Sequence, residues 1–140
     1  YYASNIAKQL DTLVTAVILG SAAQDELTAL GNYGAAKVLH AKNELLDNFD
    51  SGVYAKILIA VAEKESASII IFTHNFHGRA VAPRVAANLQ AGLVTGAVSF
   101  PDLSNGFTVK KSVFSGKAFA NVIIRSDKKV MSSSPNTFTV

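Results

Sequence analysis

The chain has 140 residues, enough to fold as one ordinary domain that buries about two-thirds of the surface its unfolded form would expose. Hydrophobic residues make up 49% and charged residues 16%, an apolar balance which indicates that part of the surface faces a partner. Cysteine is absent, which excludes a disulfide framework and any site that needs cysteine ligands. The net charge of +3 is mild and the basic residues are scattered, so the composition argues against nucleic-acid binding.

The sequence shows no membrane-spanning or secretory segment. Its longest uncharged apolar runs, such as residues 13–23, are interrupted by Thr, Gly and Ser and are too short to cross a bilayer. No basic segment precedes a hydrophobic one near the start, as a signal peptide would require. We therefore expect a soluble intracellular protein without membrane insertion.

The first part of the chain alternates short helices with short apolar runs. Residues 2–10 carry an apolar stripe at helical spacing, so the chain is expected to open in a helix. The apolar runs 13–19 and 36–40 are typical of buried strands, with a short helix over 22–30 between them. Because a parallel sheet of βαβ units normally places a strand ahead of its first helix, we expect one upstream strand outside this sequence.

A helix, a strand and a second helix are predicted next. The first of these helices begins after Asp50-Ser51, either of which can accept hydrogen bonds from its first turn. Its predicted buried residues are Tyr54, Ile57, Leu58 and Val61. Ser68–Thr73 is an apolar, β-branched run typical of a parallel strand, and Gly78–Gln90 follows as a helix. The apolar face of that helix, at four-residue spacing, is Val81, Val85 and Leu89.

The pattern changes after Gly92. Four strand-length runs follow without a helix between them, at residues 93–100, 107–114, 118–125 and 129–134. Turn residues join these runs, and among them an Asn-Gly pair is a strong hairpin signal. The sequence therefore predicts a single α/β domain over residues 1–140. We expect an open, mostly parallel sheet flanked by helices, a Rossmann-like three-layer fold of the adenine-nucleotide-hydrolase type, with a C-terminal antiparallel meander.

The turn from Thr73 to Arg79 is where an open α/β sheet would bind a ligand. Gly78 would let the backbone approach a phosphate or an adenine nucleotide, and Arg79 would supply charge. Neither a glycine-rich dinucleotide fingerprint nor a P-loop is present, so the turn can equally be one that only caps the helix. Arg84 follows Pro83 inside the same helix, where we favour a structural pairing of its guanidinium.

Histidines and serines offer weaker alternatives. His74 and His77 lie three residues apart, but no third ligand has suitable spacing and His40 ends a different strand, so we interpret both as exposed loop histidines. The serines at 132–134 lack a nucleophile elbow and a partnered His–acid pair. We name no metal ligand and no catalytic residue. A hydrolase that uses the loop histidines remains an alternative.

Two lysine pairs flank the last strands, at residues 110–111 and 128–129. They could attract an anionic partner, although exposed lysine is also how natural sheets discourage edge-to-edge association. We favour the second explanation.

Several segments resemble one known family. Gly78–Leu89 (GRAVAPRVAANL) resembles the G-K/R-x-x-x-P-R-V-A-A-x-L segment of the electron transfer flavoprotein alpha subunit. Residues 100–102 are similar to the segment at that family's Ser-Pro-Asp turn, residues 114–118 resemble its Y-A-G-N-A turn, and residues 129–138 its K-V-x-T-x-R-P-x-x-F ending. One departure is Ser134, which stands where the family usually has arginine before the proline, so whatever that arginine pairs with must be arranged differently here.

The resemblance implies the N-terminal scaffold and interaction domain of that subunit, without a catalytic site of its own. It further implies a heterodimer that carries electrons from flavin dehydrogenases to a quinone-linked acceptor through FAD. The FAD would be held mainly by the subunit's own C-terminal domain, which these residues do not include, and the chain would pack against the beta subunit. The implied location is the cytoplasm of a bacterium or the mitochondrial matrix of a eukaryote.

The same resemblance changes the interpretation of the turn and helix. It implies that the adenylate site belongs to the beta subunit, which leaves Gly78 and Arg79 as a weak anion-site candidate. Pro83 and Arg84 are then structural anchors of a scaffold helix. The alternative function is a free-standing adenine-nucleotide-binding α/β module.

Overall fold

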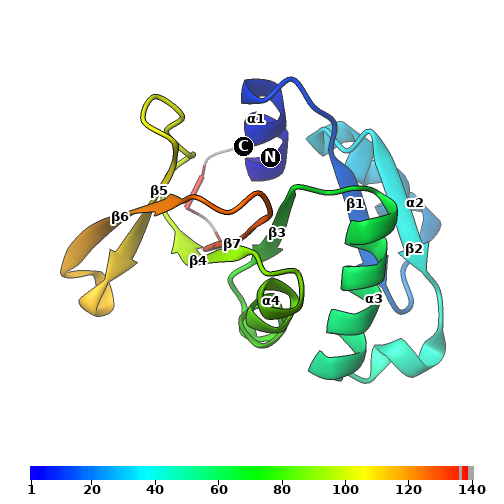
Figure 1. Ribbon diagram of the computed structural model, residues 1–140. Helices are drawn as coiled ribbons and strands as arrows, with labels where there is room; N and C mark the ends of the chain where they lie inside the picture. The colour runs from blue at the N-terminus through cyan, green and yellow to red at the C-terminus, as the bar shows by residue number, and fades with distance from the viewer. Residues whose placement is uncertain (136, 139–140) are drawn as a thin grey trace. The chain divides into compact units, whose positions relative to one another are not determined.

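The computed structural model describes residues 1–135 and 137–138, and its chain divides into two compact units (Figure 1). The first unit comprises residues 1–50 and the second begins at Ser51. Each unit holds its own sheet and is described by itself. The α/β fold class expected from the sequence, with open sheet and flanking helices, is confirmed; the expectation of a single domain stays a prediction.

The first unit is built on a pair of parallel strands. Its elements are α1 (Tyr2–Gln9), β1 (Thr15–Leu19), α2 (Gln24–Ala29), the 3₁₀ helix η1 (Leu30–Tyr33), β2 (Lys37–Ala41) and the 3₁₀ helix η2 (Glu44–Asp47). Thr15 lies opposite Lys37 and Leu19 opposite Ala41. The predicted helices and strands occur in the expected order. The second helix differs in that it continues as the 3₁₀ helix η1, which ends at Gly34 with φ +93°, and the 3₁₀ helix η2 was not predicted.

The second unit is a five-stranded mixed sheet with two helices. Its elements are α3 (Ser51–Lys64), β3 (Ile69–Thr73), α4 (Phe76–Asn88), β4 (Gly92–Ala97), β5 (Phe107–Val113), the 3₁₀ turn η3 (Phe114–Gly116), β6 (Ala118–Ile124) and β7 (Lys129–Ser133). The strand order is β3-β7-β4-β5-β6. Strands β3, β7 and β4 are parallel, whereas β5 and β6 continue the sheet in antiparallel pairing.

The predicted antiparallel meander is wrong for its last strand, β7, whereas β4, β5 and β6 do pair in antiparallel fashion. β7 leaves the hairpin of β5 and β6 and inserts between β3 and β4, parallel to both. The reason lies in its side chains: Val130, Met131 and Ser132 are consecutive and all fully buried. A strand buried on both faces is typical of the centre of a parallel sheet, where its apolar surface contributes most to stability.

Helix α4 covers one face of this sheet, packing on β7 and β4 (Figure 1). The predicted apolar face is confirmed, since Val81, Val85 and Leu89 are all buried. Helix α3 packs against α4. Its predicted buried residues are only half-buried, whereas Ala55 and Ala62 are buried instead. Both alanines are small, which lets two helices approach closely.

None of the helices in the described part of the chain is long and apolar enough to cross a membrane.

Candidate functional site

The carboxyl ends of β3, β7 and β4 form the edge at which the sequence predicts a ligand. The Ser132 hydroxyl of β7 holds this edge together: its Oγ lies 2.8 Å from His74 Nδ1 and accepts a hydrogen bond of 3.2 Å from the Gly96 N–H. The His74 N–H donates to the Ser133 carbonyl over 2.8 Å. Gly96 lies where the register between β4 and β7 shifts, with φ +70°. One buried hydroxyl therefore links three strands.

The N-terminus of α4 is capped by the side chain of Asn75. Asn75 Oδ1 accepts a hydrogen bond of 2.9 Å from the Gly78 N–H, and the Arg79 N–H donates to the Asn75 carbonyl over 3.0 Å. A Cβ atom at Gly78 would overlap the Thr73 carbonyl oxygen. Gly78 is therefore needed for the close approach of α4 to the end of β3, and its N–H is already used within the turn.

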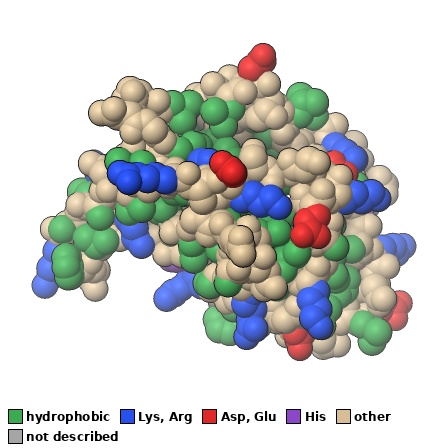
Figure 2. Space-filling model, viewed as in Figure 1, with side chains coloured by type: hydrophobic (Ala, Val, Ile, Leu, Met, Phe, Trp, Pro, Cys, Tyr) green, Lys and Arg blue, Asp and Glu red, His purple; other side chains and the backbone are tan. Residues whose placement is uncertain are grey.

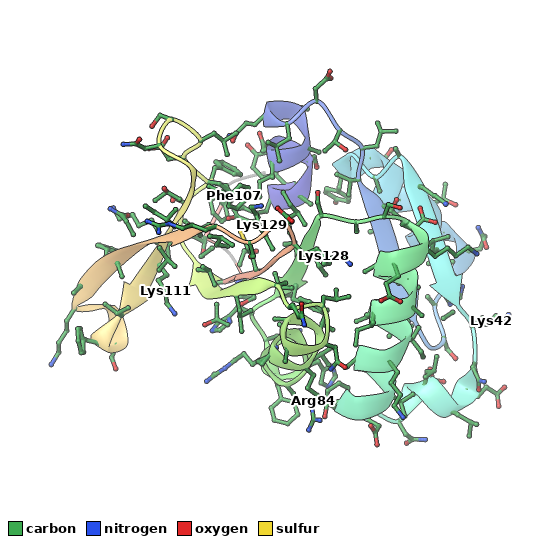
Figure 3. All side chains as sticks on the ribbon, in the orientation of Figure 1. Lys42, Arg84, Phe107, Lys111, Lys128 and Lys129 are labelled. Atoms are coloured by element: carbon green, nitrogen blue, oxygen red, sulfur yellow. The ribbon has the colours of Figure 1, made fainter. Side chains whose placement is uncertain are left out.

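Two cations set the electrostatics of this edge. The pKa of His74 is lowered below its usual value, first by burial and then by the charges of Arg79 and Lys111. Lys111 Nζ donates to Thr95 Oγ1 over 3.4 Å and is labelled in Figure 3. The edge is thus positive even though its hydrogen-bond donors are largely engaged. The assignment of Gly78 and Arg79 as anion-site candidates stays a prediction.

The pairing of His74 with Ser132 is not arranged as a nucleophile and base. Ser132 is 0% exposed, so a substrate cannot reach its hydroxyl. The described residues also include no cluster of three or more His, Asp or Glu that could hold a metal ion. The interpretation of His74 as an exposed loop histidine was wrong, since its ring is part-buried against Ser132, whereas His77 is exposed on α4.

The predicted structural anchors lie on the outer side of α4. Pro83 and Arg84 are both exposed, and Figure 3 shows Arg84 projecting from the helix. Pro83 lies inside the helix without ending it. The Arg84 side chain reaches solvent, and its role as an anchor stays a prediction.

The first unit has a corresponding edge after β1 and β2. There the carboxylate of Asp47 is held by hydrogen bonds from Ser21. Asp47 accepts hydrogen bonds from the Ser21 N–H at 2.6 Å and from the Ser21 hydroxyl at 2.7 Å, and these bonds lower the pKa of its carboxyl. His40 Nε2 lies 2.7 Å from the Gly20 carbonyl oxygen. A carboxylate in the turn after a strand repels phosphate, so this edge does not favour an anionic ligand.

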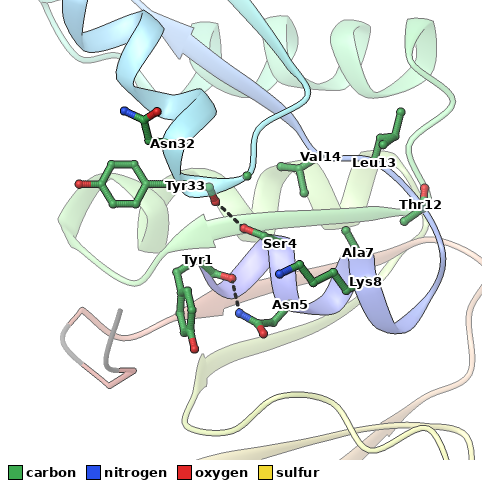
Figure 4. A pocket seen from close by; sticks show the side chains of 11 residues that line it. Tyr1, Ser4, Asn5, Ala7, Lys8, Thr12, Leu13, Val14, Asn32 and Tyr33 are labelled. Atoms are coloured by element: carbon green, nitrogen blue, oxygen red, sulfur yellow. Dashed lines mark hydrogen bonds between the residues drawn. The ribbon is translucent and has the colours of Figure 1, made fainter.

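A cavity of about 360 Å³ lies at the other end of the first unit, beside α1 and the amino end of β1 (Figure 4). Tyr1, Lys8 and Tyr33 are among the residues that line it. Ser4 Oγ donates to the Tyr33 carbonyl across its wall. Lys8 is its one charged lining residue among those described, so the chemistry of the cavity does not define a ligand class.

These features define an α/β fold in which internal hydrogen bonds join the ends of neighbouring strands. A model of the "Electron transfer flavoprotein domain" family matches residues 1–140. The chain therefore belongs to the electron transfer flavoprotein family, as its sequence segments predict.

Curated relatives support the same family. The electron transfer flavoprotein subunit alpha of Bacillus subtilis is 33% identical over 113 residues, which cover 81% of this chain and 35% of the relative. The corresponding subunit of Clostridium acetobutylicum is 31% identical over 130 residues, 91% of this chain and 39% of the relative. That of Syntrophomonas wolfei is 29% identical over 116 residues, 83% of this chain and 37% of the relative. The chain thus spans a little over a third of the length of these relatives.

Proposed function

We propose that this chain is the N-terminal scaffold and interaction domain of an electron transfer flavoprotein alpha subunit. The observation that carries the proposal is the use of Ser132, His74 and Gly96 to tie the strands to one another at the edge where a ligand would bind. Together with the family match over residues 1–140, this favours a supporting role over a catalytic one. In this proposal the chain has no catalytic residue of its own.

The whole protein, in this proposal, is a heterodimer with a beta subunit. It carries electrons from flavin dehydrogenases to a quinone-linked acceptor through FAD. At the edge beside α4 the Gly78 N–H is already bonded to Asn75 Oδ1 and the Ser132 hydroxyl is buried, so neither group is available to the flavin's pyrophosphate. We therefore assign FAD to the subunit's C-terminal domain, outside these residues. The bacterial relatives support a location in the bacterial cytoplasm.

Flavin absorbance tests this proposal. We expect the purified 140-residue chain to be colourless and the full-length alpha subunit, co-expressed with its beta subunit, to be yellow. A full-length heterodimer without flavin absorbance would contradict the proposal. Flavin bound by the chain alone would contradict the assignment of FAD to another domain.

A free-standing adenine-nucleotide-binding module is the second candidate. The observation in its favour is the positive edge formed by Arg79 and Lys111 beside His74. Calorimetric titration of AMP into the chain tests it, with an Arg79→Ala/Lys111→Ala double variant as the matched control. Heat released by the parent and lost in the variant would favour the module, and a flat trace at millimolar AMP would count against it.

A further inference from the structure

The connection between β4 and β5 ends in the Asn-Gly pair that the sequence marks as a turn. Near the tip, the backbones of Asp102 and Thr108 exchange hydrogen bonds of 2.8 and 3.0 Å, so residues 103–107 form a short loop that is closed at its base. Gly106 has φ +88°, a conformation that favours glycine. This requirement explains the glycine and leaves the side chain of Asn105 without a part in the turn.

The Asn105 side chain is open to solvent. Asn105 and Gly106 are both exposed. The neighbouring Ser104 N–H donates to Asp102 Oδ1 over 2.9 Å, but in the part of the chain that the structure describes no such contact holds the Asn105 amide. The loop projects at the upper left of Figure 1, and Figure 2 shows backbone and uncharged polar side chains there, drawn in tan. Water and hydroxide therefore reach this pair of residues.

An exposed Asn-Gly pair has a reaction available that other asparagines undergo less readily. The backbone nitrogen of the following residue attacks the side-chain carbonyl carbon of asparagine and closes a five-membered imide ring. A side chain on the following residue hinders this attack, and glycine has none. The surroundings of Gly106 also leave room, since the nearest atom to a Cβ built there is Ile123 Cγ2 at 3.5 Å.

We propose that Asn105 is a site of spontaneous deamidation. The Gly106 nitrogen, after losing its proton to base, forms a bond to Asn105 Cγ, and the side-chain nitrogen leaves as ammonia with a proton from water. Water then opens the imide at one of its two carbonyl carbons. Opening at Cγ gives aspartate, and opening at the backbone carbonyl carbon gives isoaspartate, whose main chain runs through Cγ. Overall, one water is consumed and one ammonia is released.

The products change both the charge and the backbone of the loop. From residue 103 onward the only acidic residue is Asp127. The basic residues over the same stretch are Lys110, Lys111, Lys117, Arg125, Lys128 and Lys129. Deamidation therefore places a negative charge in a basic part of the chain. Isoaspartate in addition lengthens the main chain between the paired residues Asp102 and Thr108 by one atom.

Mass spectrometry of the purified chain, incubated in mildly alkaline buffer, tests the proposal. Trypsin cleaves after Arg84 and Lys110, so a single peptide of residues 85–110 contains both Asn105 and Asn88. Asn88 is the internal control, because it is also exposed but is followed by leucine, and its Nδ2 donates to the Arg84 carbonyl over 2.8 Å. A sample digested before incubation corrects for deamidation during digestion.

The expected result is a mass gain of one amide-to-acid conversion. We expect fragmentation to locate it at Asn105 and not at Asn88, in two products of equal mass and different retention, the aspartate and isoaspartate forms. Asn105→Gln should abolish the gain, because its longer side chain would have to close a six-membered ring. Circular dichroism before and after incubation shows whether each chain is folded throughout.

A free peptide of residues 100–110, incubated in parallel, gives the rate for an unconstrained chain. We expect the folded chain to lose the Asn105 amide at a rate within about tenfold of the peptide, since a greater slowing would mean that the loop raises the barrier to ring closure by more than about 1.4 kcal/mol.

Three results would overturn the proposal: no mass gain at Asn105 in the folded chain, an equal gain at Asn88, or a rate more than about tenfold below that of the peptide. In each case the Asn-Gly pair serves the turn alone. None of these results bears on the proposed function, which flavin absorbance tests separately.

Discussion

The Nδ1 atom of His74 and the Oγ atom of Ser132 lie 2.8 Å apart, although the two residues are separated by 58 positions in the chain. His74 follows β3, and Ser132 belongs to β7, the strand beside it. The same Oγ accepts from the Gly96 N–H of β4. A polar contact of this kind inside a parallel sheet fixes the relative positions of three strands, and it also occupies groups that a ligand would otherwise use.

Removal of the Ser132 hydroxyl should therefore destabilise the fold. Ser132→Ala leaves the Gly96 N–H and His74 Nδ1 without this partner, and the expected loss in free energy of unfolding is about 1–3 kcal/mol. Urea denaturation measures it. Ser133→Ala is the matched control, because Ser133 bonds to His74 through its backbone carbonyl. Equal midpoints for the two variants would contradict a structural role for the hydroxyl.

The stability of the chain should depend on pH through His74. Burial and the charges of Arg79 and Lys111 lower its pKa in the folded chain, so the unfolded chain binds a proton at a higher pH than the folded chain does. The stability that neutral His74 contributes is present above about pH 6.5 and is lost as the pH falls through the folded-state pKa. Urea midpoints measured across this range are expected to fall with falling pH.

A variant isolates the contribution of this histidine. His74→Asn keeps a polar group near Ser132 but does not titrate, so its urea midpoint should depend less on pH than that of the parent. An NMR titration of the His74 ring gives the pKa directly. The same pH dependence in the variant, or a ring pKa above the usual histidine value, would rule out this account.

The helical part of the second unit could be predicted because its signals are local. Val81, Val85 and Leu89 recur at a spacing that places them on one face, and that face is buried against the sheet. The Asn75 cap of the same helix also lies within a few residues of the N–H that it accepts from. The spacing of the apolar residues therefore located α4, whereas its first residue is Phe76 and its Asn75 cap was not predicted.

The pairing of the strands could not be predicted in the same way. Residues 125–128 join β6 to β7 by a connection short enough for a hairpin, yet β7 pairs with β3 and β4. The choice depends on burial of Val130 and Met131 against elements far away in the chain. His74 was misjudged for the same reason, because only the placement of β7 brings Ser132 beside it. The sequence around His74 carried no signal of this contact.

Gly78→Ala should destabilise the second unit. An added Cβ would overlap the Thr73 carbonyl oxygen, so α4 must move away from the end of β3, at an expected cost of about 1–3 kcal/mol. Gly31→Ala is the matched control, because nothing lies within 4 Å of a Cβ at that position. Thermal denaturation of both variants checks the expectation. If Gly78→Ala is as stable as the parent, the glycine serves something other than the packing of α4.

Arg84→Ala should affect partner binding more than folding. The side chain is exposed, so we expect the free energy of unfolding to change by less than about 0.5 kcal/mol. If Arg84 is an anchor toward the beta subunit, its loss should weaken the Kd of the full-length heterodimer by at least about fivefold, since arginine is enriched among the residues that dominate interfaces.

Arg84→Lys keeps the charge but loses the planar guanidinium that pairs with a carboxylate through two hydrogen bonds. We therefore expect the lysine variant to have an affinity between those of the parent and the alanine variant. Calorimetry with the beta subunit gives the affinities and urea denaturation the stabilities. If Arg84→Ala changes neither quantity, Arg84 is not an anchor.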